Sequence, residues 1–150
     1  MITLNTLSQI KELLTSVGLK ATHQRLVILE ALRKMDNHPT IDQIYNQVSE
    51  DNPSISLATV YKTTEALVEK GLLAKVSTPE GLMRYDARLD SHGHIYCINT
   101  KELVDFYDDE LDQLIIEFFK KKKVNNLKIK NISVRINGEK LDPRKNVLIK

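Results

Sequence analysis

The sequence predicts an α+β chain with an N-terminal winged helix-turn-helix domain (residues 1–86), a hinge (87–91) and a small C-terminal α+β domain (92–150). In the first part, apolar residues recur at helical spacing between capping and stop signals, and a strand–turn–strand pattern follows. The second part changes to alternating apolar residues on either side of one amphipathic helix. A length of 150 residues, with 41% hydrophobic and 28% charged residues, suits two small globular domains.

Four helices are expected before residue 72. They run from Leu4 to Val17, from the cap Thr22 to near Met35, from the capping box Thr40/Gln43 to the Asn52-Pro53 break, and from the cap Ser56 to Lys70. Gly18 and Gly71 end the first and fourth of these helices. The link Asn37-His38-Pro39 is expected to be extended, because a residue before proline avoids the right-handed helical region.

A β-hairpin is expected after the fourth helix. Its strands run from Leu72 to Ser77 and from Leu82 to Asp86, and the segment Thr78-Pro79-Glu80-Gly81 between them is a strong turn signal. Short helices followed by a hairpin describe a winged helix-turn-helix, in which the fourth helix reads DNA and the hairpin is the wing.

The C-terminal part should contain strands, one helix and a further strand. The expected elements are strands at 94–98 and 103–107 joined by a turn at Asn99-Thr100, a helix from Asp108 or Asp109 to Lys123, a strand at 127–136 bulged near Lys130-Asn131, and a turn at Asn137-Gly138. The helix has an apolar face of Leu111, Leu114, Ile115, Phe118 and Phe119. Its acidic start and basic end both complement the helix dipole. For residues 139–150 the pattern leaves a short strand and a loose tail both open.

Composition excludes several classes of protein. Apolar runs fall short of the roughly 18 residues that span a bilayer, and no signal-peptide pattern opens the chain. The single cysteine, Cys97, cannot form an internal disulfide, so we expect a cytoplasmic protein without a membrane partner. The net charge is only +2, and residues 1–86 carry nine basic and ten acidic side chains. Charge alone therefore does not identify a DNA-binding half.

Potential metal ligands cluster between Asp86 and Asp105. Two histidines flank Gly93 in the segment His92-Gly93-His94, and acidic residues lie on both sides of them. A mixture of nitrogen and carboxylate ligands suits Fe²⁺ or Mn²⁺. Spacing alone is a modest signal, since a lone histidine such as His38 is more often an ordinary surface side chain.

Five motifs in order resemble the ferric uptake regulator superfamily over essentially the whole chain. They are His38-Pro39-Thr40, Ala58-Thr59-Val60-Tyr61, Arg84-Tyr85-Asp86, His92-Gly93-His94-Ile95-Tyr96-Cys97 and Val104-Asp105-Phe106. The aspartate at 105, where iron-sensing members carry glutamate, resembles the peroxide-stress regulator (PerR) branch. The resemblance implies a regulatory metal site formed by His38, Asp86, His92, His94 and Asp105.

The resemblance also implies function. It describes a homodimeric repressor, with residues 92–150 as the dimerisation domain. The repressor binds an A/T-rich, pseudo-palindromic double-stranded operator when loaded with Fe²⁺ or Mn²⁺; Zn²⁺ could enter the site in vitro. In the peroxide-sensing branch, iron and hydrogen peroxide oxidise a ligating histidine, and the matching positions here are His38 and His92. Loss of that ligand would release the metal and then the operator.

Contacts with DNA are expected from the fourth helix and from the start of the second. The expected residues are Tyr61, Thr59, Lys62, Ser56, Lys20 and Arg25. The resemblance makes Tyr61 a base contact, against a thymine methyl group, and Lys20 and Arg25 phosphate contacts. The alternatives are a core position for Tyr61 and solvated surface charges for Lys20 and Arg25.

The chain departs from the family in its cysteines. Members of the family commonly hold a structural zinc with two Cys-x-x-Cys pairs. Here Thr100 stands three places after Cys97, where the second cysteine of a pair would lie, and residues 98–150 contain no cysteine. Because that tetrahedral site needs four thiolates, we expect no structural zinc. We expect Cys97 to be a buried, small apolar side chain.

Three other functions remain open. An iron-sensing or zinc-sensing regulator of the same superfamily is the nearest alternative. A non-haem iron enzyme would share histidine and carboxylate ligands, but five protein ligands leave little room for substrate, so we do not expect an enzyme. A metal-free winged-helix regulator could use Cys97 as a thiol switch.

Overall fold

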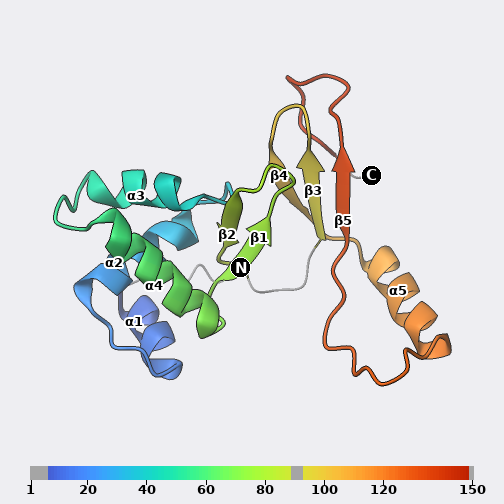
Figure 1. The fold of residues 1–150 in the computed structure, drawn as a ribbon, viewed down its shortest axis with the longest axis horizontal. Coiled ribbons are helices and arrows are strands. Elements are labelled where there is room, and N and C mark those ends of the chain that lie inside the picture. Colours follow the sequence, from blue (N-terminus) through green and yellow to red (C-terminus); the bar gives the residue numbers. More distant parts are fainter. Residues whose placement is uncertain (1–6, 89–92, 149–150) are drawn as a thin grey trace. The chain divides into compact units, whose positions relative to one another are not determined.

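The computed structural model describes residues 7–88 and 93–148, and the chain divides into two compact units, residues 1–89 and 90–150 (Figure 1). Unit 1 contains α1 (Leu7–Ser16), α2 (His23–Lys34), α3 (Ile41–Ser49), α4 (Leu57–Glu69), β1 (Ala74–Ser77) and β2 (Met83–Asp86). Unit 2 contains β3 (Gly93–Cys97), β4 (Leu103–Phe106), α5 (Asp109–Lys121) and β5 (Arg135–Gly138). The predicted α+β class is confirmed, with a winged helix-turn-helix followed by a small α+β unit. Leu4 and most of the expected hinge lie outside the described residues.

Capping side chains set the helix boundaries in unit 1, as the sequence predicts. Thr22 accepts a hydrogen bond from the backbone N–H of Arg25, and Ser56 accepts one from that of Thr59. Thr40 and Gln43 form the full capping box of α3. Each bond satisfies a donor that the first helical turn leaves without a partner, so these boundaries could be predicted locally.

The core of unit 1 lies among its four helices and under the β1–β2 hairpin. Helix α2 is central, because it contacts α1, α3 and α4. The buried side chains are Ile10, Leu14, Ile28, Leu29, Leu32, Ile44, Val48, Ile55, Val60, Leu67, Leu73 and Tyr85. Leu29 and Leu32 lie three residues apart on α2, and Ile44 and Val48 lie four residues apart on α3, so the helical spacing of apolar residues is confirmed as a buried face on each helix.

The wing, residues 74–86, is an antiparallel hairpin that pairs Ala74 with Asp86 and Ser77 with Met83. Its turn is closed by hydrogen bonds from the Gly81 N–H to the Thr78 carbonyl and from the Thr78 hydroxyl to the Leu82 carbonyl. The hairpin prediction is confirmed, with both strands shorter than expected. Because side chains alternate along β2, Tyr85 enters the core while Arg84 and Asp86 share the opposite face.

The link before α3 corrects a prediction. His38 is not extended but has a φ of +50°, in the left-handed region. That region is uncommon for residues other than glycine and costs on the order of 1–3 kcal/mol. Tertiary contacts from β2, described below, therefore override the local preference of a residue before proline.

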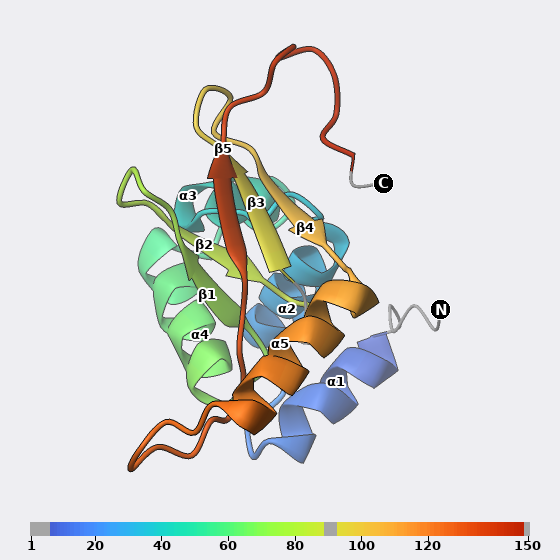
Figure 2. The ribbon, with the colours of Figure 1, turned by 90° about the vertical axis from the view of Figure 1, so that its right-hand side faces the viewer.

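Unit 2 is built on a three-stranded sheet in the order β4-β3-β5 (Figure 2). Strands β3 and β4 form the predicted antiparallel pair, while β5 runs parallel to β3. The predicted strand over 127–136 is wrong, because only Arg135–Gly138 is β-structure. The predicted turn at Asn137-Gly138 is also wrong: these residues end β5, and Gly138 pairs with Cys97.

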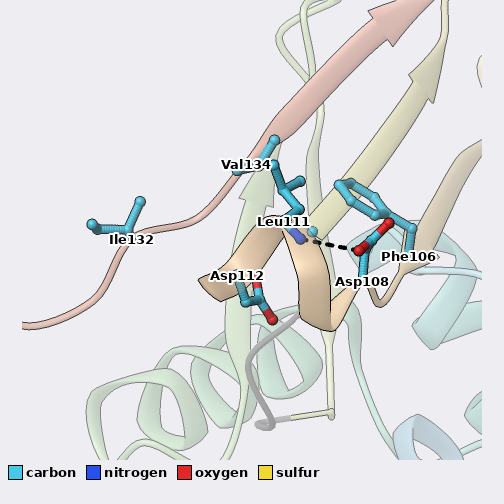
Figure 3. A pocket seen from close by; sticks show the side chains of 7 residues that line it. Phe106, Asp108, Leu111, Asp112, Ile132 and Val134 are labelled. Carbon is cyan, nitrogen blue, oxygen red and sulfur yellow. Dashed lines mark hydrogen bonds between the residues drawn. The ribbon is translucent and has the colours of Figure 1, made fainter. Parts of the chain in front are cut away.

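Helix α5 begins as predicted, with Asp108 accepting from the Leu111 N–H at 3.0 Å (Figure 3). Its apolar face is less covered than expected. None of its described residues is buried, Leu114 and Phe118 are exposed, and Leu111 packs against the β3–β4 cluster. The Phe118 and Phe119 rings contact each other edge to face at 5.0 Å. The apolar face of α5 therefore remains largely exposed in the described chain.

Gly93 is required by close packing. A Cβ added there would lie 2.3 Å from the ring of Phe106, a distance that no real contact allows. We expect Gly93→Ala to lower the free energy of unfolding by about 1–3 kcal/mol, because the buried ring would have to move. Gly138→Ala in β5 is the matched control, since no atom lies within 4 Å of its Cβ. Urea unfolding would measure both variants, and equal effects would contradict the packing role of Gly93.

None of the described helices combines the length and apolar character needed to cross a membrane.

Candidate metal centre

Unit 1 contributes one histidine and one aspartate that lie together. His38, at the entrance to α3, places Nε2 3.5 Å from Asp86 Oδ2 at the end of β2. Both side chains are buried. The other carboxylate oxygen of Asp86 accepts the backbone N–H of Arg88 at 2.8 Å, which fixes the orientation of the carboxylate. A nitrogen and an oxygen are thus presented side by side.

Unit 2 contributes a second such pair. His94 in β3 and Asp105 in β4 stand directly opposite each other in the antiparallel register. His94 Nε2 lies 3.2 Å from Asp105 Oδ1. Because opposite residues of a hairpin share one face of the sheet, the strand pairing itself brings the two together.

The spacing within each pair fits two neighbouring ligands of one cation. Donors bound at about 2.1 Å in octahedral geometry lie about 3 Å apart. The observed separations of 3.5 Å and 3.2 Å are close to that value. Imidazole nitrogen and carboxylate oxygen together suit a divalent first-row metal such as iron or manganese. Of the five ligands expected from the sequence, two lie in each unit, and His92 lies outside the described residues.

Helix α4 presents the side chains expected to read DNA. Tyr61 is 55% exposed, so the alternative of a core position is wrong, and Lys62 is exposed on the next position. Ser56 and Thr59 have a structural role, because their hydroxyls lie 2.9 Å apart within the N-terminal cap of the helix. The outward-facing candidates on this helix are therefore Tyr61 and Lys62.

The two expected phosphate contacts differ in their surroundings. The guanidinium of Arg25 donates to the backbone carbonyl of Lys20 at 3.0 Å, which holds the connection before α2. The side chain of Lys20 is exposed. Arg25 thus stabilises the loop that carries Lys20.

Cys97 is buried, as expected, with 2% of its surface exposed, among Ile95 and Phe106. The neighbouring turn is tied to the end of β5 by polar contacts. The Asn99 side chain exchanges two hydrogen bonds, each of 3.0 Å, with the backbone of Lys140. The Lys140 ammonium lies 2.5 Å from Glu102. These contacts hold the two segments together in the described chain.

Sequence reasoning assigned no role to Arg84, although its motif was visible. Its Nη1 donates to the backbone carbonyl of His38 at 3.4 Å. The signal that could have drawn attention to it is the alternation along β2, which places residue 84 on the same face as Asp86.

A winged helix-turn-helix unit followed by an α+β unit, with one histidine–aspartate pair in each, suits a metal-responsive transcription regulator. The model of the ferric uptake regulator family matches residues 16–136 of the chain. The peroxide-responsive repressor PerR of Staphylococcus saprophyticus is 32% identical over 109 residues, which cover 71% of this chain and 74% of that relative. This protein therefore belongs to the ferric uptake regulator family.

Solved structures agree with this assignment. The Campylobacter jejuni peroxide stress regulator is 29% identical, with a TM-score of 0.68, and the match covers 95% of this chain and 98% of that one. The ferric uptake regulator of Vibrio cholerae is 26% identical, with a TM-score of 0.71, covering 86% and 98%. The fold and the relatives are those of metal-binding, DNA-binding dimeric repressors.

Proposed function

We propose that this protein is a metal-dependent repressor of the peroxide-sensing type, which binds Fe²⁺ or Mn²⁺ through His38, Asp86, His92, His94 and Asp105. The observation that carries the proposal is the pair of histidine–aspartate contacts, one in each unit, with separations that suit ligands of a single ion. The PerR relatives and the aspartate at position 105 support the peroxide-sensing branch.

An ion held by ligands from both units would act as a switch. Its binding free energy is available only when the two units are brought together, so metal would favour one arrangement over others. In a dimer, that arrangement would set the spacing of two α4 helices, which must match major grooves about 34 Å apart. Metal loading would thereby control operator affinity.

The iron form would also sense peroxide. Iron held by these ligands would supply the redox chemistry that activates hydrogen peroxide beside the imidazoles. The imidazole that is oxidised would supply the two electrons that reduce the peroxide. His38 or His92 would gain one oxygen atom from the peroxide, and the second oxygen would leave as water. The modified ring no longer offers the same nitrogen lone pair, so the site would lose a ligand. Because each molecule modifies itself, we regard the protein as a regulator rather than an enzyme.

Operator binding with controlled metal loading tests this function. Fluorescence anisotropy on an A/T-rich, pseudo-palindromic operator should detect tight binding with Mn²⁺ or Fe²⁺ and weak binding by the metal-free protein. Peroxide should reverse binding only in the iron form. Binding that depends on metal but does not respond to peroxide would instead indicate an iron-sensing or zinc-sensing regulator, and binding without metal would contradict the proposal.

A protein of this kind acts on the chromosome, so we place it in the cytoplasm.

Tyr61 is expected to contact a thymine methyl group, since its ring is exposed on α4. Tyr61→Ala should weaken operator binding by about 1–2 kcal/mol, whereas Tyr61→Phe, which keeps the ring, should not. Replacing thymines by deoxyuridines removes the methyl groups and should weaken binding of the wild type but not of Tyr61→Ala. Additive losses from the two changes in anisotropy titrations would exclude this contact.

A further inference from the structure

Three consecutive residues of β2 contact the two-residue segment His38-Pro39. The Arg84 guanidinium donates to the His38 carbonyl at 3.4 Å, the Tyr85 N–H donates to the Pro39 carbonyl at 2.9 Å, and Asp86 lies 3.5 Å from the His38 ring. Two adjacent backbone carbonyls and one imidazole are therefore held by a single strand. All of these residues belong to unit 1.

The backbone of His38 is strained and must be stabilised by its surroundings. Its φ of +50° lies in a region that a residue with a side chain adopts only when its surroundings impose it. The direction of the His38 carbonyl is set by its ψ angle, and the guanidinium bond on that carbonyl fixes it. A bond from a charged donor is stronger than one between neutral groups, so Arg84 is suited to oppose relaxation of this strained residue.

Arg84 is in turn connected to the turn of the wing. Its Nη2 lies 3.8 Å from Glu80 Oε1. That carboxylate oxygen also lies 3.4 Å from the Thr78 hydroxyl, which donates its proton at 2.9 Å to the Leu82 carbonyl that closes the turn. Glu80 and Arg84 thus form a continuous polar connection between the tip of the wing and the backbone of His38.

We propose that Arg84 is a positioning residue for the His38 ligand: it holds the left-handed backbone that presents the imidazole beside Asp86 and, through Glu80, couples the wing to this half of the metal site. The inference rests on the proposed metal function. By thermodynamic linkage, a wing held by DNA should strengthen metal binding as much as bound metal strengthens DNA binding.

Variants of Arg84 in the full-length protein test the inference. Arg84→Gln keeps much of the side chain but removes its charge, and Mn²⁺ affinity should fall about 10- to 100-fold, as for other residues that orient metal ligands. Arg84→Lys, which keeps a cationic donor, should recover most of that loss. Glu65→Gln is the matched control, because it breaks the 2.7 Å ion pair with Lys75 of the wing without touching His38. Its Mn²⁺ affinity should be that of the wild type.

The metal-free protein supplies a second readout. In Arg84→Gln, hydrogen exchange of the Tyr85 amide should accelerate about 10-fold or more, and the ring resonances of His38 should shift; Glu65→Gln should leave the His38 resonances unchanged. If Arg84→Gln does not fold, Glu80→Gln replaces it, with an expected loss of Mn²⁺ affinity of about threefold.

Wild-type Tyr85 exchange and wild-type Mn²⁺ affinity in Arg84→Gln would overturn the inference, as would a loss that Arg84→Lys does not restore. Failure of the wild type itself to bind Mn²⁺ would refute the proposed function instead. The positioning role would then be decided by Tyr85 exchange and the His38 resonances of the metal-free protein.

Discussion

Peroxide treatment of the Fe²⁺-loaded protein is expected to add one oxygen atom to His38 or His92 and to lower operator affinity by about 100-fold or more, toward non-specific binding. The physical reason is the loss of a ligand whose bond favours the DNA-binding arrangement. The Mn²⁺-loaded protein should keep both its mass and its operator affinity, because manganese does not support the same reaction. Peptide mass spectrometry, paired with anisotropy on the same samples, measures both effects.

The chain contains its own control for this experiment. His23, the one of the four histidines outside the proposed ligand set, hydrogen-bonds Asn52 at 3.3 Å in unit 1. Its peptide should gain no oxygen. Release of the operator with His38 and His92 both unmodified would contradict the mechanism and would direct attention to Cys97. Because Cys97 is buried, we expect Cys97→Ser to respond to peroxide like the wild type.

Leu114→Asp is expected to convert the homodimer that we propose to a monomer at micromolar concentration and to weaken binding to a two-half-site operator by about 100-fold or more. Leu114 is 59% exposed on α5, next to the exposed Phe118, and large exposed apolar patches mark interfaces. A second copy of the chain is the partner that fits, because repressors of this family are dimeric. Burying a carboxylate in that interface would cost several kcal/mol.

Leu7→Asp is a closely matched control. Leu7 is 58% exposed on α1, in unit 1, so the same change is made at the same exposure outside the proposed interface. Light scattering after size-exclusion chromatography should report a dimer for Leu7→Asp and a monomer for Leu114→Asp. A dimeric Leu114→Asp protein would exclude this face of α5 from the interface.

Short sequence motifs were sufficient to predict most of the helix boundaries in unit 1. Thr22, Thr40 and Ser56 satisfy the first turns of their helices from within a few residues, so their roles can be predicted without knowledge of the fold. The pair formed by His94 and Asp105 is also local, because the observed register of the β3–β4 hairpin places the two residues opposite each other. Each of these features depends on residues close in sequence.

The features that could not be predicted depend on distant partners. The left-handed backbone of His38 is imposed by β2, more than 40 residues away. Alternating apolar residues between Leu127 and Ile136 suggested a long strand, but β5 pairs with a β3 of only five residues, and Leu127, Ile129 and Ile132 stay exposed. A half-buried strand requires alternating apolar and polar residues, but this pattern forms a strand only where a neighbouring strand is present to pair with it.

The parallel pairing of β5 explains the misplaced turn as well. Asn137-Gly138 has the composition of a tight hairpin turn. In the structure, Gly138 accepts the Ile98 N–H at 2.8 Å and so extends the sheet beside β3. A turn signal was overridden by a hydrogen-bonding partner 40 residues earlier in the chain.

Calorimetric titration with Mn²⁺ tests most directly whether one ion joins the two histidine–aspartate pairs. The wild type should bind one equivalent per chain at this centre. His38→Ala and His94→Ala should each abolish that binding, and the double variant should be no worse than either, because ligands of one ion are not additive. His23→Ala should bind like the wild type. Two equivalents in the wild type, with one surviving in each single variant, would show two separate sites and contradict the account.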